Sequence, residues 1–545
     1  MNRVSKNRVS KSVSRALVGL GVTVVAATLA LAQSPASGGM VIAYKDDIAT
    51  LDPQVGYDWQ NWPAIKMVFD ALLDYKPGTT DLEPRIAAAM PKVGDGGKSY
   101  TFLIRKGIKF TNGRELNAND IKYTLERVLD PKTKSPGAGF FLDIAGSDAF
   151  SSGKSKDLSG VKVINANSVK VTLSQPNAAF LNVLATNFAF IVPKEEVIKA
   201  GEDWGRKPVG SGPFTLESWT TGQELTFKRN PNYFIQSLPK LETVNIKVGQ
   251  DPSVAYLALQ RGEVDLLGDG IAPANFLQAQ SDPKLKSLIV STPLVNTTYV
   301  SINQNIKPFT DLRVRQALQY AIDKKKVLKI INGRGLIANQ ILPPKMPGFD
   351  SSYKGYGYNP EKAKALLKAA GLAKGFSSTL YTNSTDPNPR IAQSIQQDLA
   401  AVGIKIELKS QAASTVIQAA GTPKTAPLVW SGGMAWTQDY PDPSDFYWPI
   451  LSCRSAVQGG WNWTFVCDKT LDAAASKADQ MTAPEMRSKR LAAYKKIYQK
   501  LMDQSVWVPM FNEVRYTMHS EKLVGEATDF IDPIHNIAYE RLSVK

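Results

Sequence analysis

The sequence predicts a mixed α/β protein with at least two lobes. Its 545 residues exceed the roughly 250–300 residues at which single hydrophobic cores stop growing. Alternating polar and apolar residues, which are typical of hairpins, recur in the first part of the chain. From residue 376 onward, stretches typical of strands and helices alternate, which predicts a sheet covered by helices.

The first part of the chain predicts one strand, two helices and two hairpins. The strand, the first helix and the hairpins are expected at 39–47, 62–75, 98–113 and 161–176. The second helix is expected at 117–131. Asn117 suits its N-cap, Asp120 lies three residues later, and the Asp130-Pro131 pair suits its end.

The second part predicts a β-α-β-α-β succession. The five elements are expected at 376–383, 390–403, 404–410, 413–420 and 426–430. Ligands of such sheets bind beyond the carboxyl ends of the strands. The loop that follows Trp430 is therefore expected at a ligand site. Extended segments at 296–305 and 506–516 flank this part, and if both cross between the lobes, a hinged cleft results.

The N-terminus is typical of an export signal. Residues 1–15 carry five basic residues and no acid, residues 16–32 are apolar, and Ala30-Leu31-Ala32 suits signal cleavage. An uncleaved anchor is the alternative. No cysteine lies near the cleavage site, so no lipid attachment is expected there. The protein is expected to be exported, periplasmic or in the cell envelope, and soluble after cleavage near Ala32.

Composition argues against several function classes. The net charge is +16, but the basic residues are spread along the chain, whereas a nucleic-acid site needs a concentrated patch. His519 and His535 are the two histidines, and a zinc site from His and Cys is not expected at that count. No nucleophile elbow occurs, and 93–99 lacks the first glycine of a phosphate loop. No catalytic residue, metal or cofactor is predicted.

Cys453 and Cys467 are the two cysteines of the chain. In an oxidising compartment this pair favours one disulfide that closes a short loop. Two free thiols are the alternative.

Asp439 lies among aromatic residues, and five of the ten tryptophans fall between 430 and 463. In one interpretation the rings form a core and Asp439 is a structural loop acid, and residue types alone favour this. In the other the rings line a pocket, and a partly desolvated carboxylate awaits a cation. Asp442 and Asp445 are interpreted as turn residues, because Asp-Pro pairs such as Asp442-Pro443 suit turns. Calcium is not expected here, because Pro441 and Pro443 impose extended or turn geometry and the glycine spacing of an EF-hand loop is missing.

Several motifs resemble one family, the periplasmic solute-binding proteins of peptide ABC importers, the dipeptide and oligopeptide-binding group. They follow the family order and span the mature chain: "YTFLIRKGIKFTNGRELNANDIKYTLERVLDP", "KPVGSGPFTLESW", "FKRNPNYF", "FTDLRVRQALQYAIDKKKVL", "YNPEKAKALLKAAGL" and "WTQDYPDPSDF". The resemblance implies a periplasmic-binding-protein-like fold with two α/β lobes, an inserted subdomain and two hinge crossings. Its boundaries are expected to be 1–32 for the signal, 33–83, 207–299 and 508–545 for lobe I, 84–206 for the subdomain and 300–507 for lobe II.

The resemblance also implies a ligand site. Asp439 occupies the family position that binds the α-amino group of the peptide, and Arg390 the position that meets the carboxylate in dipeptide binders. A surface arginine in a salt bridge is the alternative for Arg390, and Arg454 is a weaker candidate for its role. The extended segment from Tyr299 to Asn303 could pair with the peptide backbone. Trp430, Trp436 and Tyr440 are expected as aromatic walls of the site.

The resulting prediction is an exported binding protein that captures short peptides and delivers them to a membrane permease. It is expected to be a monomer without enzymatic activity, cofactor or nucleic-acid partner. Two alternatives stay open. One is an oligosaccharide-binding relative on the same scaffold, and the other is a secreted carbohydrate-active enzyme that uses Asp439 with Asp442 or Glu513.

Overall fold

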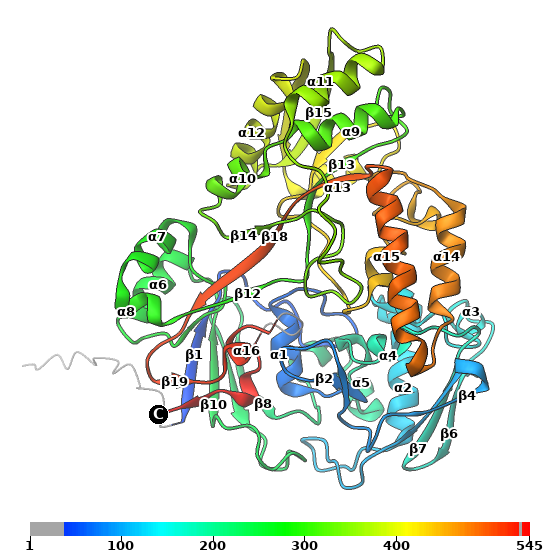
Figure 1. The fold of residues 1–545 in the computed structure, drawn as a ribbon. Helices are drawn as coiled ribbons and strands as arrows, with labels where there is room; N and C mark the ends of the chain where they lie inside the picture. The colour runs from blue at the N-terminus through cyan, green and yellow to red at the C-terminus, as the bar shows by residue number, and fades with distance from the viewer. Residues whose placement is uncertain (1–37, 533–536) are drawn as a thin grey trace, which may run out of the picture.

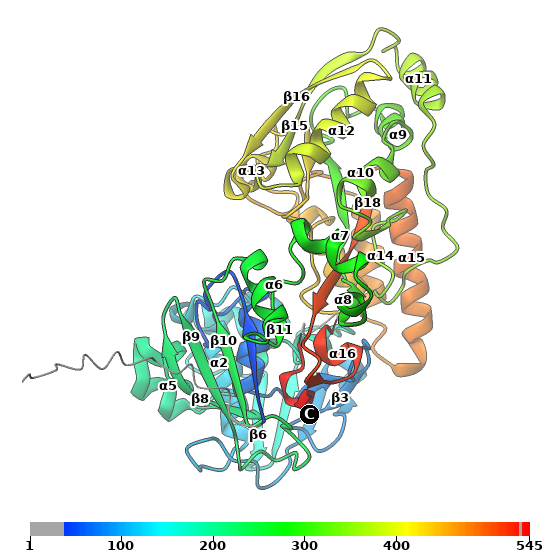
Figure 2. The ribbon, with the colours of Figure 1, turned by 90° about the vertical axis from the view of Figure 1, so that its left-hand side faces the viewer.

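The computed structural model describes residues 38–532 and 537–545. The predicted export signal and His535 lie outside the described residues. The chain forms two α/β lobes and an additional subdomain, and the long strand β18 (Trp507–Met518) runs from one lobe to the other (Figures 1 and 2). This arrangement confirms the predicted fold class. In the described part of the chain, no helix combines the length and apolar character that crossing a membrane needs.

Lobe I is built on a five-stranded sheet in the order β11-β1-β10-β9-β8. β1 pairs in parallel with β10 and β11, whereas β8, β9 and β10 form an antiparallel meander. All five residues of β1 are buried, as expected for a strand covered on both faces. The strands are β1 (Gly39–Ala43), β8 (Phe214–Thr220), β9 (Glu224–Arg229), β10 (Thr243–Lys247) and β11 (Leu266–Leu267).

The first helix of lobe I is shorter than predicted. α1 (Asn61–Val68) ends where the Val68 carbonyl accepts a hydrogen bond from the Gly212 backbone N–H at 2.8 Å. Phe69 is extended, and the Leu72 carbonyl accepts from the Arg85 N–H at 3.0 Å. A Cβ at residue 212 would lie 2.4 Å from the Val68 carbonyl carbon, so glycine permits this close approach. The prediction of a helix through residue 75 was therefore wrong.

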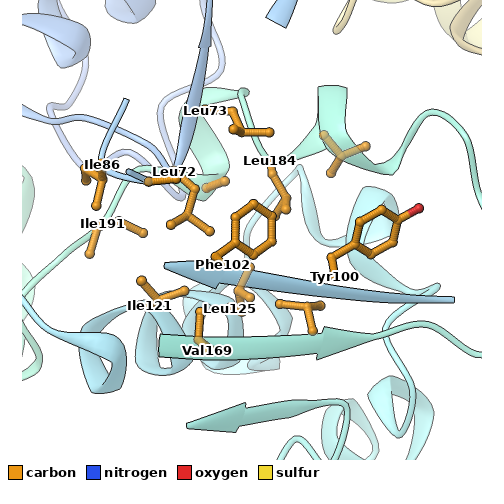
Figure 3. Close-up of a cluster of buried hydrophobic side chains, with 14 of the residues drawn as sticks. Leu72, Leu73, Ile86, Tyr100, Phe102, Ile121, Leu125, Val169, Leu184 and Ile191 are labelled. Carbon is orange, nitrogen blue, oxygen red and sulfur yellow. The ribbon is translucent and has the colours of Figure 1, made fainter. Parts of the chain in front are cut away.

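The inserted subdomain contains a four-stranded antiparallel sheet in the order β4-β5-β7-β6. Its strands are β4 (Lys92–Gly94), β5 (Ser99–Leu103), β6 (Val161–Asn165) and β7 (Ser168–Thr172). The hairpin predicted at 161–176 is confirmed as β6–β7. The segment 98–113 instead contributes the single strand β5, whose partners are β4 and β7. Phe102 of β5 packs against apolar side chains of β7 and of α2 (Ala118–Leu129) (Figure 3).

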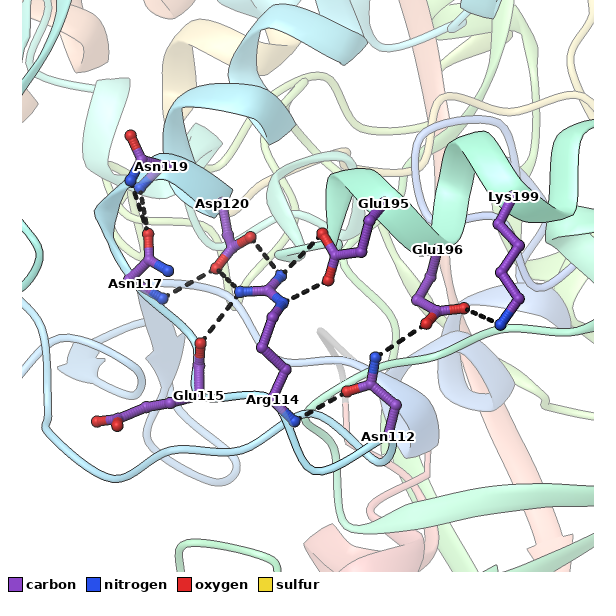
Figure 4. A network of polar contacts seen from close by, with 9 residues as sticks. All are labelled: Asn112, Arg114, Glu115, Asn117, Asn119, Asp120, Glu195, Glu196 and Lys199. Carbon is purple, nitrogen blue, oxygen red and sulfur yellow. Dashed lines mark hydrogen bonds and ion pairs between the residues drawn. The ribbon is translucent and has the colours of Figure 1, made fainter.

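Helix α2 has the predicted N-terminal cap. The Asn117 side chain accepts from the Asn119 N–H, and Asp120 accepts from the Asn117 N–H, which completes a capping box. Arg114 binds Asp120 with two hydrogen bonds of 3.0 and 2.6 Å and also contacts Glu195 of α5 (Lys194–Ala200) (Figure 4). The network therefore joins the beginnings of two helices.

Lobe II is built on strands of a seven-stranded sheet in the order β12-β18-β13-β17-β15-β16, with β14 also pairing β18. β15 pairs in parallel with β16 and β17, as predicted. The strands are β12 (Ile289–Pro293), β13 (Thr298–Ile302), β14 (Gly335–Ile337), β15 (Phe376–Asn383), β16 (Ile404–Gln411) and β17 (Leu428–Trp430). The intervening helices are α12 (Asn388–Ala400) and α13 (Ala413–Ala420). All five predicted elements are confirmed.

Two segments connect the lobes: one runs through β12 and β13, and the other is β18. β18 pairs antiparallel with β12 through residues 514–518 and with β13 through residues 507–511. The two segments therefore run side by side between the lobes, as the extended patterns predicted.

The remaining elements cover the sheets or link them. The helices are α3 (Ser147–Ser151), α4 (Phe180–Val183), α6 (Pro252–Gln260), α7 (Pro273–Ser281), α8 (Pro283–Ser287), α9 (Leu312–Ala321), α10 (Lys324–Ile330), α11 (Pro360–Ala369), α14 (Lys469–Asp479), α15 (Arg487–Asp503) and α16 (Ala527–Phe530). Two short sheets pair β2 (Leu73–Tyr75) with β3 (Leu82–Pro84) and β19 (Leu523–Val524) with β20 (Ser543–Val544). The predicted Cys453–Cys467 disulfide is present.

Candidate functional site

A cavity of about 740 Å³ lies between the lobes, within the size range of ligand pockets. Lobe I contributes aromatic residues that precede or begin α1: Tyr57, Trp59 and Trp62. Lobe II contributes the loop at 433–439 together with Trp461, and the crossing segments contribute residues 294–296 and 513–516. A ligand in this cavity would therefore contact both lobes and the strands that join them.

The loop that carries Asp439 follows β17, as predicted, and lies along a crossing segment. The Ser431 N–H donates to the Tyr299 carbonyl at 3.0 Å, and the Tyr299 N–H donates to Ser431 Oγ at 2.9 Å. Further along, the Gln438 N–H donates to the Val295 carbonyl at 3.2 Å. Because both ends of the loop are tied to the strand, the position of Asp439 follows from the hinge backbone.

A buried ion network holds the other side of this loop. Asp442 begins the short 3₁₀ turn η6 (Pro443–Phe446), where its side chain accepts from the Ser444 N–H. This confirms Asp442 as a turn residue. Arg490 binds both oxygens of Asp442, at 2.6 and 2.7 Å, and Asp479 at 2.9 Å. Burial alone would raise the pKa of Asp442, but Arg490 and Ser444 hold it below its ordinary value.

Asp439 presents two different oxygens. The Tyr57 hydroxyl donates to Oδ1, whereas Oδ2 is fully buried and has no hydrogen-bond partner among the described residues. The Asp439 N–H donates to Asp445 Oδ2 at 3.0 Å, and the Trp436 indole N–H donates to the same oxygen at 3.4 Å. In the described part of the chain, neither Asp439 nor Asp445 forms an ion pair.

Burial dominates the electrostatics of this group. It raises the pKa of Asp439, while hydrogen bonds with Tyr57 and Asp445 act in the opposite direction. It also raises the pKa of Asp445, and the nearby Asp439 charge adds to the effect. Burial and Asp439 together raise the pKa of Tyr57. Asp439 and Asp445 therefore form a desolvated acidic pair that has no ion-pair partner among the described residues.

Asp439 also borders a smaller cavity of about 40 Å³. The wall of this second cavity is mainly aromatic and comes from lobe I and the subdomain: Trp62, Tyr75, Phe188 and Phe190. Tyr57 packs on Trp62 and Phe188, with ring centroids 5.9 and 5.5 Å apart. Trp62 and Asp439, which accepts the hydrogen bond of Tyr57, border both cavities.

The structure brings some predicted site residues together and leaves others in the core. Trp436 lines the large cavity. Tyr440 packs in the core of the subdomain, with its ring 5.9 Å from Phe140. Three further residues are buried and none of them lines the large cavity. Tyr299 stacks on Trp507 at 3.5 Å, Trp430 donates to Asn388 Oδ1 at 3.0 Å, and Asn303 donates to two backbone carbonyls.

Arg390 lies in a neighbouring recess of about 490 Å³, in the first turn of α12. Its exposed guanidinium binds Asp386 with two hydrogen bonds of 2.7 Å. Arg390 is thus a surface arginine in a salt bridge. Arg334 lines both this recess and the large cavity. Arg454 instead lies 4.5 Å above the Trp448 ring.

Sequence reasoning missed the contribution of lobe I to the site. Tyr57, Trp59 and Trp62 fall within six residues, a density of aromatic residues like the one that drew attention to the second lobe. The same criterion, applied to "QVGYDWQNW", could have found them. Their proximity to Asp439, more than 370 positions away in the chain, is a tertiary property.

A two-lobed α/β molecule with crossing strands and an interlobe cavity has the architecture of a ligand-binding protein that closes around a hinge. The chain belongs to the bacterial extracellular solute-binding proteins, family 5, because the model of the middle region of this family matches residues 81–458. The match covers more than half of the sequence.

Curated relatives span nearly the whole chain. The dipeptide-binding protein of Escherichia coli K12 is 29% identical over 551 residues, with 97% of this chain and 98% of that protein covered. Heme-binding protein A of Haemophilus influenzae is 30% identical and covers 84% of each chain. A glutathione-binding protein of Salmonella choleraesuis is 28% identical, with 93% of this chain and 95% of that protein covered. These relatives are solute-binding proteins with different ligands.

Solved structures confirm the fold. The periplasmic binding protein DppA from Helicobacter pylori, in complex with the peptide STSA, has a TM-score of 0.75 and 25% identity, with 93% of this chain and 98% of that chain covered. The dipeptide-binding protein of Pseudoalteromonas sp. SM9913, in complex with Met-Leu, has a TM-score of 0.73 and 25% identity, with 93% and 100% covered.

Proposed function

We propose that this protein is exported, captures short peptides between its lobes and delivers them to the permease of an ABC importer. One observation carries the proposal: Asp439 lines a cavity of about 740 Å³, and its Oδ2 is buried without a hydrogen-bond partner among the described residues. The α-amino group of a peptide is a cation small enough to meet that oxygen.

The physical reason is the cost of a desolvated charge. A buried carboxylate without a counter-ion is unfavourable, and a charge-assisted hydrogen bond from an ammonium group relieves that cost. An importer that accepts many sequences needs contacts with features that every peptide has. Asp439 would supply the contact with the N-terminus, and aromatic walls would accommodate varied side chains.

The complexes of the relatives support a peptide ligand. DppA of Helicobacter pylori and the Pseudoalteromonas protein hold a tetrapeptide and a dipeptide. The predicted division into lobe I, the subdomain and lobe II is part of the proposal, and so is a monomeric protein without catalytic activity. Arg390 stays a proposed carboxylate ligand, which would have to exchange Asp386 for the peptide.

An oligosaccharide is the second candidate ligand. Trp59, Trp62, Trp436 and Trp461 line the large cavity, and aromatic rings also stack on sugars. The enzyme alternative is less favoured, because Arg490 occupies both oxygens of Asp442. Glu513 would then have to be the second carboxylate.

Calorimetric titration separates these ligands. We expect Met-Leu or Ser-Thr-Ser-Ala to bind, their N-acetylated forms to bind more weakly, and oligosaccharides not to bind. Asp439→Asn should weaken binding of the free peptide by roughly 1.5–3 kcal/mol, as for a lost charged hydrogen-bond partner. It should leave binding of the acetylated peptide almost unchanged. Equal affinity for free and acetylated peptides would contradict the ammonium site.

A further inference from the structure

Two neighbouring carboxyl groups at the site each have an unused buried oxygen. Asp439 Oδ2 and Asp445 Oδ1 are both buried without a hydrogen-bond partner among the described residues. The two residues are linked because Asp445 Oδ2 accepts the Asp439 N–H at 3.0 Å. The Asp439 charge also adds to the effect of burial in raising the pKa of Asp445. Two neighbouring desolvated carboxylates cannot both be ionised at low cost, so one of them retains a proton.

The surrounding charged groups do not supply the missing cation. Lys66 of α1, which borders the small cavity, binds Asp74 of β2 at 2.9 Å. Arg490 of α15 is shared by Asp442 and by Asp479 of α14. Both cations therefore already have carboxylate partners.

The other titratable groups around the pair also fail to neutralise it. Four tyrosines face it, and burial raises the pKa of each: Tyr57, Tyr75, Tyr440 and Tyr498. They stay neutral in the physiological range. At the large cavity, Asp58, Asp269 and Glu513 are acidic, whereas Arg334 and Arg515 lie over the rings of Phe276 and Trp59.

We propose that Asp439 and Asp445 share one proton in the ligand-free protein and release it to solvent when a ligand's ammonium group binds Asp439. The free pair carries one proton and one negative charge. In the complex both carboxylates are ionised and the ammonium group contributes one positive charge, so the local charge is unchanged. This inference rests on the proposed function, and it makes Asp445 a positioning residue that sets the protonation of Asp439.

The sign of the pH effect follows from this exchange. Below the pH at which the free pair loses its proton, the ligand must displace that proton. Kd then rises by about tenfold for each unit by which the pH falls. Above this midpoint, Kd is independent of pH until the ligand's own amino group, with an ordinary pKa of about 8, is deprotonated. Affinity is therefore lost on acidification.

Calorimetry of Met-Leu binding in two buffers of different ionisation enthalpy tests the proposal on the unaltered protein. We expect proton release to approach one per bound peptide at pH 5 and to fall as pH rises. Binding without proton release at pH 5 would contradict the inference alone. Failure of every peptide to bind would contradict the proposed function and the inference with it.

Asp445→Asn provides the matched variant. The asparagine can still accept the Asp439 N–H, but it cannot exchange a proton. Removing the second carboxylate should therefore shift the rise in Kd to lower pH, because Asp439 alone, whose pKa burial still raises, gives up its proton more easily than the pair. Asp157→Asn is the control, since this exposed aspartate pairs with Lys122 in the subdomain, and its pH profile should match that of the unaltered protein. A pH profile of Kd in Asp445→Asn that matches the profile of the unaltered protein would overturn the proposal.

Discussion

The two oxygens of Asp439 have separate tasks in the proposed site. The Tyr57 hydroxyl, which comes from the opposite lobe, binds Oδ1, whereas Oδ2 is buried and has no hydrogen-bond partner among the described residues. The hydrogen bond lowers the pKa of Asp439 against the larger effect of burial. Tyr57 therefore favours the ionised carboxylate that an ammonium group needs, and it connects the lobes at the same point.

Tyr57→Phe tests this contribution. The variant keeps the ring contacts with Trp62 and Phe188 and removes only the hydroxyl. We expect peptide affinity at pH 7 to fall by about 1 kcal/mol, the usual value of one hydrogen bond, in calorimetric titrations. Tyr358→Phe, at an exposed position, should have no effect. Equal losses in the two variants, or none in Tyr57→Phe, would show that the hydroxyl does not support the anchor.

At the residue scale, the sequence singled out Asp439 as a proposed ligand group but did not indicate the aromatic residues that lobe I contributes to the cavity wall. Asp439 could be predicted because its prolines and aromatic neighbours follow a strand end, and because a family motif matches. Tyr299 and Asn303 were expected at the ligand, but all five residues of β13, which include Tyr299, are buried, and so is Asn303 just beyond its end. A strand covered on both faces has no alternation that marks a cavity-facing side.

At the element scale, local patterns predicted what local forces determine. The strands β15 and β16 and the helices between and after them repeat their apolar residues at regular spacing, and the structure follows these patterns closely. The end of α1 could not be predicted in this way. It depends on Gly212, which lies 144 positions from Val68 and accepts no side chain there.

The capping box of α2 predicts a measurable loss. Asn117→Ala removes the acceptor for the Asn119 N–H, and lost N-caps typically reduce the free energy of unfolding by 0.5–2 kcal/mol. We expect a lower midpoint of urea unfolding, with peptide affinity unchanged, because α2 lies outside the cavity wall. Gln418→Ala, at an exposed position of α13, should change stability by less than 0.5 kcal/mol. A midpoint unchanged in Asn117→Ala would contradict the capping role.

The Arg490 network predicts a pH-dependent loss of stability. Arg490→Leu leaves Asp442 and Asp479 buried without their cation, which should cost about 3–5 kcal/mol at pH 7. In the unaltered protein, the lowered pKa of Asp442 gives stability above the ordinary carboxyl pKa of about 3.9, and this stability is lost as pH falls. In Arg490→Leu, the buried carboxyl groups of Asp442 and Asp479 take up protons as pH falls, which removes their uncompensated charge.

The difference in the free energy of unfolding between the unaltered protein and Arg490→Leu should therefore be largest near pH 7 and shrink towards pH 4. Thermal unfolding at several pH values measures it. Arg313→Leu, which removes an exposed arginine paired with Asp311, is the control and should show a small, nearly constant difference. A gap between Arg490→Leu and the unaltered protein that widens on acidification would contradict this account.

At the scale of the whole molecule, the ligand cavity, the hinge and the disulfide-bearing lobe are physically connected. The crossing segments supply both the joint between the lobes and part of the cavity wall. Helix α14 also contacts the subdomain, where the Ala178 N–H donates to the Asp479 carbonyl at 2.8 Å. Any change in the angle between the lobes therefore changes the cavity and these contacts together.

Closure on the ligand is the prediction that belongs to this scale. A peptide held by Asp439 in lobe II and by the aromatic residues of lobe I binds best when the lobes are close, so it should shift the population towards closed molecules. We expect small-angle X-ray scattering to show a smaller radius of gyration with saturating Met-Leu and no change with its N-acetylated form. At 100 times Kd the peptide should also raise the free energy of unfolding by about 2.7 kcal/mol. A peptide that stabilises the protein without reducing its radius of gyration would place the ligand in a cavity that is already closed, and the hinge would then have no part in capture.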